Sequence, residues 1–238
     1  MSTDKRQQDE GFVLHTYPYQ ETSLIAEAFS RHHGRIALVA KGARRPRSGM
    51  RGLIRQFQPL QLNWFGKTEL RTLADVEWVA GHVPLRGIGL LCGFYLNELL
   101  LKLLAREDPH ERLYDVYRAL LPELSRATNV EPLLRAFELT LLRELGYALN
   151  LERTADTDEA VAAQGLYAFS FDRGPLARAG SGDAVKFAGK TFLDMNNADY
   201  SDPVTSLQSK QLMRAAISHH LNGQPLHTRQ LLRDLQTL

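Results

Sequence analysis

The residues best suited to chemistry in this chain form one short cationic stretch, residues 41–55, which we call the basic loop. Its sequence, KGARRPRSGMRGLIR, carries six cationic side chains and no acidic one. Guanidinium and ammonium groups bind phosphate oxygens, and the three glycines of the stretch let a backbone approach a phosphate closely. The chemistry indicated is the binding of a polyanion, and nucleic acid is the first candidate.

Acidic residues are missing from a longer segment around the basic loop. No Asp or Glu occurs between Glu27 and Glu69, whereas a solvated surface normally mixes both signs of charge. A merely solvated loop is the alternative interpretation, but it does not account for so long an acid-free segment. The cations expected to contact nucleic acid are Arg31, Arg35, Lys41, Arg44, Arg45, Arg47, Arg51, Arg55 and Lys67.

The basic loop contains no aromatic residue, so stacking on bases must come from side chains outside it. We name Trp64 and Phe65, beside a Gly-Lys turn, as stacking candidates, although a core position suits them equally well. Tyr17 and Tyr19 are further candidates, and Phe57 is better explained as a core residue. Stacking on aromatic side chains contributes about 1–3 kcal/mol per base.

Residues suited to catalysis or metal binding form no recognisable pattern. The pairs His32-His33 and His219-His220 are adjacent, so their side chains diverge on a strand or a helix and are better read as turn and surface histidines. The single cysteine, Cys92, excludes an intrachain disulfide and a cysteine-based zinc site. No P-loop, GxGxxG, GxSxG or HExxH string occurs. We therefore expect no catalytic residue, no metal and no cofactor.

The whole-chain numbers describe an ordinary globular protein of 238 residues, with 44% hydrophobic and 24% charged residues and a net charge of +2. Residues 1–8 lack the apolar core of a signal peptide, and no segment has the apolar length of a membrane span. With the single cysteine, these features predict a cytoplasmic protein that does not enter the membrane.

The elements that must position the basic loop are short strands. Apolar runs predict five of them between residues 11 and 80, after a flexible N-terminus of residues 1–10. A small closed barrel suits five short strands, and the OB-fold is the leading candidate because it commonly binds oligonucleotides. The runs cover residues 12–17, 24–29, 36–39, 53–62 and 70–79, with a hairpin turn at His33-Gly34.

After Gly81 the apolar period changes from about two to about 3.6, which predicts an α-helical domain over residues 81–238. Residues 150–190 lose this period and form an irregular, cysteine-free insertion. The predicted fold class is α+β multidomain, a five-stranded OB-fold barrel over residues 11–80 followed by the helical domain. Helices are expected over residues 90–103, from Asp108-Pro109 (Pro109 at the first helical position) to 121, 129–146, from Asp202-Pro203 to 222, and 228–236.

The third predicted helix carries Arg135, Leu139, Leu142 and Arg143 at helical spacing. The favoured interpretation is the edge of an amphipathic helix with snorkelling arginines. The alternative is a groove that takes an acidic-hydrophobic peptide from a partner protein.

Several strings resemble, in order and spacing, the RecO family of bacterial recombination mediators. No single string is highly specific, but together they extend from about residue 11 to residue 233. The strings are VLHTYPYQETSLI (13–25), FSRHHGR (29–35), KGARR (41–45), QFQPL (56–60), ELRTL (69–73), FELTLLRELGY (137–147) and PLHTR (225–229).

The resemblance implies an N-terminal OB-fold, binding of single- and double-stranded DNA, and annealing of complementary strands at the bacterial nucleoid. It also implies loading of the recombinase RecA onto strands coated by single-strand-binding protein, in concert with RecR and sometimes RecF. The acidic tail of single-strand-binding protein docks on the helical domain in relatives. With this resemblance, the groove interpretation of Arg135 and its neighbours weighs equally with the amphipathic-helix interpretation. Many members bind zinc through four cysteines in the insertion; this chain has none there, so we predict no metal.

Two other classes of function stay open. One is an OB-fold RNA-binding protein. The other is a nucleic-acid-processing enzyme, which would need clustered carboxylates for a divalent metal, and the acid-free segment contains none.

Overall fold

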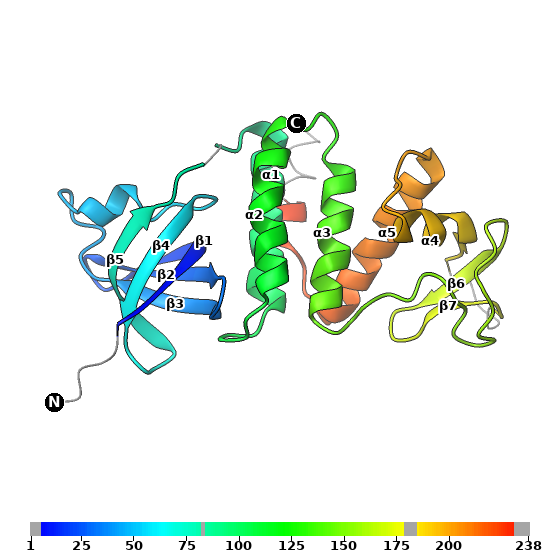
Figure 1. Cartoon of the computed structure of the whole chain (residues 1–238), viewed down its shortest axis with the longest axis horizontal. Coiled ribbons are helices and arrows are strands. Elements are labelled where there is room, and N and C mark those ends of the chain that lie inside the picture. Colours follow the sequence, from blue (N-terminus) through cyan, green and yellow to red (C-terminus); the bar gives the residue numbers. More distant parts are fainter. Residues whose placement is uncertain (1–5, 82–83, 179–184, 231–238) are drawn as a thin grey trace. The chain divides into compact units, whose positions relative to one another are not determined.

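The computed structural model describes residues 6–81, 84–178 and 185–230. The chain divides into two compact units. Unit 1 comprises Met1–Ala127 and Leu226–Leu238, and unit 2 comprises Thr128–Pro225. Figure 1 labels most of the strands and helices of the two units.

Unit 1 begins with a five-stranded closed barrel, which confirms the predicted OB-fold (Figure 1). Around the barrel the strands follow the order β1-β2-β3-β5-β4, and β3 and β5 run parallel while the other pairs are antiparallel. The strands are β1 (Gln7–Tyr19), β2 (Ser23–Ser30), β3 (Gly34–Ala40), β4 (Pro59–Phe65) and β5 (Leu70–Trp78).

Alternating apolar residues close the barrel, because strand side chains point to opposite faces in turn. On β3, Ile36, Leu38 and Ala40 all point into the barrel core. Gly34 begins β3 with φ +65°, and a Cβ there would lie 2.1 Å from the carbonyl oxygen of Asp108. Only glycine fits this position, both for its backbone conformation and for the close approach.

The N-terminal boundary of the barrel differs from the prediction. Residues 1–10 were expected to be flexible, yet Gln7 to Glu10 belong to β1 and pair with β4, where Gln7 lies opposite Trp64. Their polarity suggested fraying, but an antiparallel partner strand satisfies their backbone groups. Residues 1–5 lie outside the described residues.

Two helices complete unit 1 as far as Ala127: α1 (Gly87–Leu103) and α2 (Glu111–Arg126). The rings of Phe12 and Phe29 on the barrel pack against Tyr114 and Tyr117 on α2, with centroids 5.1–6.4 Å apart. This buried aromatic cluster explains why the compact unit continues past the domain boundary predicted at residue 80. Pro109 was expected at the first position of α2, but the helix begins two residues later.

Unit 2 contains α3 (Glu131–Glu144), α4 (Gly189–Asn196), α5 (Pro203–His220), and a three-stranded sheet. The sheet, of order β7-β6-β8, lies in the predicted irregular insertion and is formed by β6 (Leu166–Ser170), β7 (Gly174–Leu176) and β8 (Phe187–Ala188). Helix α4 was not predicted. Asp202 caps α5 as its sequence suggests, accepting hydrogen bonds from the backbone N–H groups of Val204 and Thr205 at 2.8 and 3.0 Å.

The last predicted helix, residues 228–236, falls mostly outside the described residues, and those from 227 to 230 are helical. Within the described part of the chain, no helix has both the length and the apolar character needed to cross a membrane.

Candidate nucleic-acid interface

The basic loop connects β3 to β4 and is anchored to the end of the barrel. Ala43 and Ile54, near its two ends, are buried in the barrel core, and Met50 and Leu53 pack partly against that core. The backbone N–H of Arg44 donates to the carbonyl of Thr22 at 2.9 Å, which ties the loop to the β1–β2 turn. A short 3-10 helix, Gly49–Gly52, lies in the middle of the loop. The apolar residues of the basic loop pack against the barrel, and the cations of the loop face solvent.

All six cations of the basic loop are exposed. None of them forms an ion pair with any residue that the structure describes, and Arg44 donates only a long hydrogen bond, 3.4 Å, to the carbonyl of Gln20. The positive charge of this surface is therefore not neutralised by the side chains that the structure describes. The six residues are Lys41, Arg44, Arg45, Arg47, Arg51 and Arg55.

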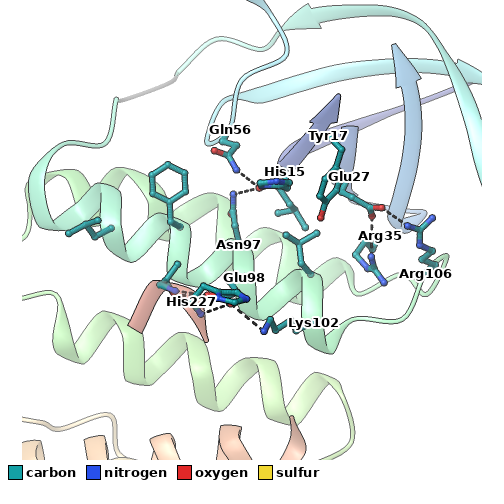
Figure 2. Close-up of a pocket in the computed structure, with 15 residues that line it drawn as sticks. His15, Tyr17, Glu27, Arg35, Gln56, Asn97, Glu98, Lys102, Arg106 and His227 are labelled. Carbon is teal, nitrogen blue, oxygen red and sulfur yellow. Dashed lines mark hydrogen bonds and ion pairs between the residues drawn. The ribbon is translucent and has the colours of Figure 1, made fainter. Parts of the chain in front are cut away.

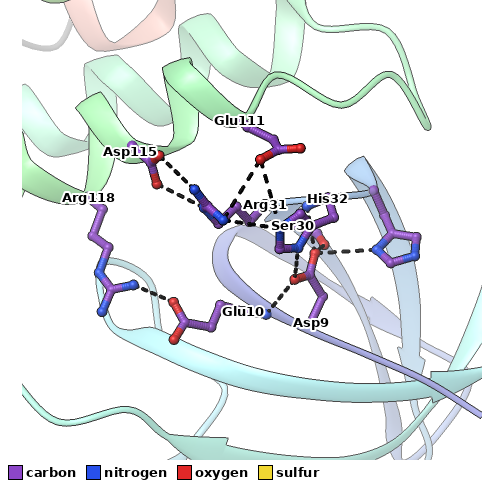
Figure 3. Close-up of polar contacts among 9 residues, drawn as sticks. Asp9, Glu10, Ser30, Arg31, His32, Glu111, Asp115 and Arg118 are labelled. Atoms are coloured by element: carbon purple, nitrogen blue, oxygen red, sulfur yellow. Dashed lines mark hydrogen bonds and ion pairs between the residues drawn. The ribbon is translucent and has the colours of Figure 1, made fainter.

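Arg31 and Arg35 are different: the sequence places them in the acid-free segment, but each forms an ion pair with a carboxylate from outside it. The guanidinium of Arg31 donates two hydrogen bonds to the Asp115 carboxylate of α2, at 3.0 and 2.9 Å (Figure 3). These bonds lower the pKa of Asp115 below its usual range. Arg35 donates to the buried carboxylate of Glu27 at 3.1 Å. Asp115 is distant in sequence, whereas Glu27 borders the acid-free segment and lies on β2, the strand that pairs with β3.

The β2–β3 turn, residues 31–33, closes around the buried side chain of Asp9, and we call this end of the barrel the paired end. The carboxylate of Asp9 accepts a hydrogen bond from the backbone N–H of His32 at 2.7 Å and another from the hydroxyl of Ser30. The ring nitrogens Nδ1 of His32 and His33 lie 2.7 and 3.3 Å from it. Burial raises the pKa of Asp9, but these hydrogen bonds together bring it below its ordinary value.

His32 and His33 thus have a structural partner, Asp9, that their neighbours in sequence do not reveal. Asp9 comes from β1, the strand that pairs with β2 (Figure 3). Among the residues that the structure describes, no group of three or more His, Cys, Asp and Glu side chains could hold a metal ion.

Trp64 cannot stack on a base, so this part of the predicted site is wrong. Its side chain is fully buried in the barrel core, and its indole N–H donates to Oε1 of Gln7 at 2.7 Å. Phe65, 39% exposed, and Lys67 are accessible. Leu70 lies beside Ala37 in the parallel β3–β5 pair, so the β4–β5 turn points toward the paired end, away from the basic loop.

Other aromatic residues lie nearer to the basic loop. Tyr17, on β1, is 46% exposed, and Trp78, at the end of β5, is 55% exposed. The indole N–H of Trp78 lies 3.4 Å from the carbonyl oxygen of Leu53 in the basic loop. Trp78 was not singled out from sequence, because it falls within a run that predicts a strand. Phe57 is buried, as predicted, and its ring packs against Phe94 at 5.2 Å.

In unit 2, two of the four residues that the peptide-groove alternative names, Arg135 and Leu142, are buried. Arg135 is buried and donates to Glu138, itself fully buried, at 2.7 Å. Leu142 belongs to the core of the unit, Leu139 packs partly against that core, and only Arg143 is exposed. Because Glu138 lies one turn from Arg135 on the same helix, it supplies the negative charge that a partner peptide was expected to bring.

A pocket of about 860 Å³ lies between the barrel, α1 and residues 227–228 of unit 1 (Figure 2). Leu91, Phe94 and Leu101 give it an apolar side. Its two carboxylates are engaged within the chain. Glu27 accepts from Arg35 and Arg106, and Glu98 accepts from the backbone N–H groups of residues 227 and 228 at 2.8 and 2.9 Å. The pocket was not predicted, since the residues that form it are far apart in sequence.

A closed five-stranded barrel with an anchored and uncompensated basic loop defines an OB-fold protein suited to nucleic acid. The family model "Recombination protein O N terminal" matches residues 1–82, and "Recombination protein O C terminal" matches residues 86–230. The chain therefore belongs to the RecO family, as its sequence strings indicated, and this family acts in DNA repair and recombination.

Relatives with the name DNA repair protein RecO align along nearly the whole chain. The protein from Nitrosospira multiformis is 51% identical, with 100% of both chains covered. The protein from Aromatoleum aromaticum is 50% identical, with 97% of each chain covered. The one from Burkholderia pseudomallei is 53% identical over 95% of this chain and 83% of the relative.

Proposed function

We propose that this protein binds single- and double-stranded DNA through the basic loop and anneals complementary strands during recombinational repair. The observation that carries the proposal is the set of six exposed cations on an anchored loop, with no ion-pair partner among the described residues. Phosphate groups neutralise such cations and release condensed counterions, which favours binding of any strand irrespective of its sequence.

Annealing follows from the same chemistry. Two DNA strands repel each other through their phosphates, and a cationic surface that contacts both backbones lowers this repulsion. The bases then select their partners by pairing, so the protein needs no catalytic group for this task. The basic loop, which has cationic side chains and no carboxylate, is suited to holding strands.

The proposal extends to the partners that the family resemblance implies. In this proposal the protein works with RecR, and sometimes RecF, to load RecA onto strands coated by single-strand-binding protein. Family membership supports these partners.

The test compares two sets of arginines that have the same chemistry. The triple variant Arg44→Ala/Arg45→Ala/Arg47→Ala removes three cations of the basic loop, and Arg31→Ala removes one cation of the paired end. Binding to a single-stranded oligonucleotide is measured over a range of salt concentrations. For the triple variant we expect weaker binding and a plot of log affinity against log salt that is less steep by about 2, since each phosphate contact contributes about 0.7 for single strands.

Arg31→Ala serves as the matched control and should keep the slope of the wild-type protein. An unchanged affinity and slope in the triple variant would overturn the proposal. Annealing of complementary strands precoated with single-strand-binding protein should be accelerated by the wild-type protein and less so by the triple variant. Competition with RNA of equal length separates this function from RNA binding, which would be the better interpretation if RNA displaced the DNA.

A further inference from the structure

We infer that Trp78 is a stacking platform for unpaired bases, and that it gives the basic loop a preference for single-stranded over duplex DNA. The inference rests on the proposed DNA binding of that loop and names the form of DNA that the site prefers. It concerns a residue outside the acid-free segment.

Trp78 lies at the basic-loop end of the barrel. It is the last residue of β5 and pairs with Leu60, one residue after the start of β4. The basic loop ends shortly before β4, and the next residue, Gln56, forms a β-bridge with Val13. Trp78 is therefore next to the segment through which the basic loop returns to the barrel.

The side chain of Trp78 makes a long hydrogen bond to the basic loop. Its indole N–H lies 3.4 Å from the carbonyl oxygen of Leu53, and Leu53 packs against the barrel core. The exposed cations Arg51 and Arg55 stand two residues before and two residues after Leu53. The exposed ring therefore contacts the basic loop at a residue whose close neighbours in sequence are cations that can bind a phosphate backbone.

The exposure of Trp78 points to a ligand with a flat apolar face. More than half of this large side chain, 55%, is open to solvent, although burial of a tryptophan would remove a large apolar area from water. An unpaired base has a flat aromatic face that can stack on the indole ring, and every base can stack in this way irrespective of sequence. In a duplex the bases are stacked on each other, so the same ring has no free base face to contact.

The two tryptophans of the chain provide a direct measurement of this contact. Trp64 is fully buried and its indole N–H is bonded within the barrel, whereas Trp78 is exposed. Intrinsic fluorescence therefore contains one signal that a bound base can quench and one that it cannot reach. The variant Trp78→Leu leaves only the signal of Trp64, which also reports whether the barrel is folded.

The experiment titrates the full chain with a 20-nucleotide oligo(dT) and with a duplex of equal length. For the wild-type protein we expect oligo(dT), but not the duplex, to quench the tryptophan fluorescence. Trp78→Leu should weaken oligo(dT) binding roughly tenfold, a factor within the range that stacking of a single base accounts for, and should change duplex binding less than twofold. Trp78→Phe, which keeps an aromatic face, should restore most of the affinity for oligo(dT).

The outcomes separate the inference from the proposed function. If oligo(dT) binds with the expected salt dependence but Trp78→Leu binds equally well and the wild-type fluorescence is unchanged, the stacking inference is overturned and the basic-loop proposal stands. Equal quenching by duplex and oligo(dT) would overturn the preference for unpaired bases. If neither DNA binds the wild-type protein, both the inference and the proposed function are overturned.

Discussion

The two ends of the barrel contain arginines from the same acid-free segment, yet their surroundings are opposite. At the paired end, Arg31 and Arg35 meet the carboxylates of Asp115 and Glu27. At the other end, the cations of the basic loop meet no carboxylate of a described residue. The net charge of a sequence segment therefore does not give the net charge of the surface it forms, because acids from outside the segment can pair with its cations.

This difference separates two roles for the same side chain. At the paired end a guanidinium takes part in holding β2, β3 and α2 in place, so its loss should affect stability. In the basic loop the anchoring is done by Ala43 and Ile54 in the barrel core, so its cations are available for a ligand. The comparison predicts effects on stability at one end and effects on DNA binding at the other.

The largest effect on stability is expected for Glu27→Gln. The carboxylate of Glu27 is buried and bonded to both Arg35 and Arg106, and its loss leaves two cations with a neutral amide. Breaking a buried ion pair in this way lowers the free energy of unfolding by about 3 kcal/mol. Urea denaturation followed by circular dichroism measures the change.

The matched comparison for Glu27→Gln is the triple variant of the basic loop, Arg44→Ala/Arg45→Ala/Arg47→Ala. Its stability should stay within about 0.5 kcal/mol of wild type, since exposed substitutions usually have small effects. Equal losses in the two variants would break the distinction between the two ends.

The next effect concerns the pH dependence contributed by Asp9. Its pKa is lower in the folded protein than its ordinary value of 3.8. A lowered folded-state pKa contributes stability that is fully present above the unfolded value and is lost as the pH falls through the folded value. The variant Asp9→Asn has no carboxylate to protonate, so this loss of stability at low pH should be absent. At neutral pH the variant should be less stable than wild type by about 1–3 kcal/mol, because buried donors lose their charged acceptor.

Urea denaturation at a series of pH values between roughly 2 and 7 checks this prediction. The informative quantity is the difference in stability between wild type and Asp9→Asn, which should shrink below pH 3.8. Parallel curves for the two proteins would show that Asp9 does not hold the turn in the way its contacts indicate.

Among the variants of the paired end, the smallest effect on stability is expected for Arg31→Ala. The Arg31–Asp115 ion pair is exposed to solvent and is screened by salt, so its loss should lower stability by well under half of the Glu27→Gln effect. High salt should reduce the difference from wild type further, as measured by thermal denaturation at two ionic strengths. An Arg31→Ala variant as damaged as Glu27→Gln would show that Arg31 holds the barrel against α2 more strongly than an exposed pair can.

Local patterns in the sequence account for much of the fold. Alternation along residues 36–40 predicts β3, the change of apolar period after Gly81 predicts α1, and Asp202-Pro203 predicts the start of α5. These features depend on neighbours within one element, so the chain encodes them locally. Helix α4 and the small sheet of the insertion escaped prediction because their residues show no such period.

Among the candidate site residues, the cations of the basic loop lie where the sequence placed them, on an accessible connection between β3 and β4. Their exposure is readable from sequence, because a segment rich in Gly, Pro and Arg has few apolar side chains to bury. The same segment also contains the apolar residues that anchor it, although Leu53 was read as part of a strand.

The amino-acid sequence by itself determined the barrel and helical pattern, the acid-free basic loop and the family. Only the tertiary structure decided that Arg31 and Arg35 are paired, that Trp64 is buried while Trp78 is exposed, and that Arg135 is buried in unit 2. The physical reason is that pairing and burial depend on side chains brought together from distant parts of the chain. Asp9 reaches the β2–β3 hairpin from β1 and Asp115 reaches it from α2, and no local pattern records that meeting.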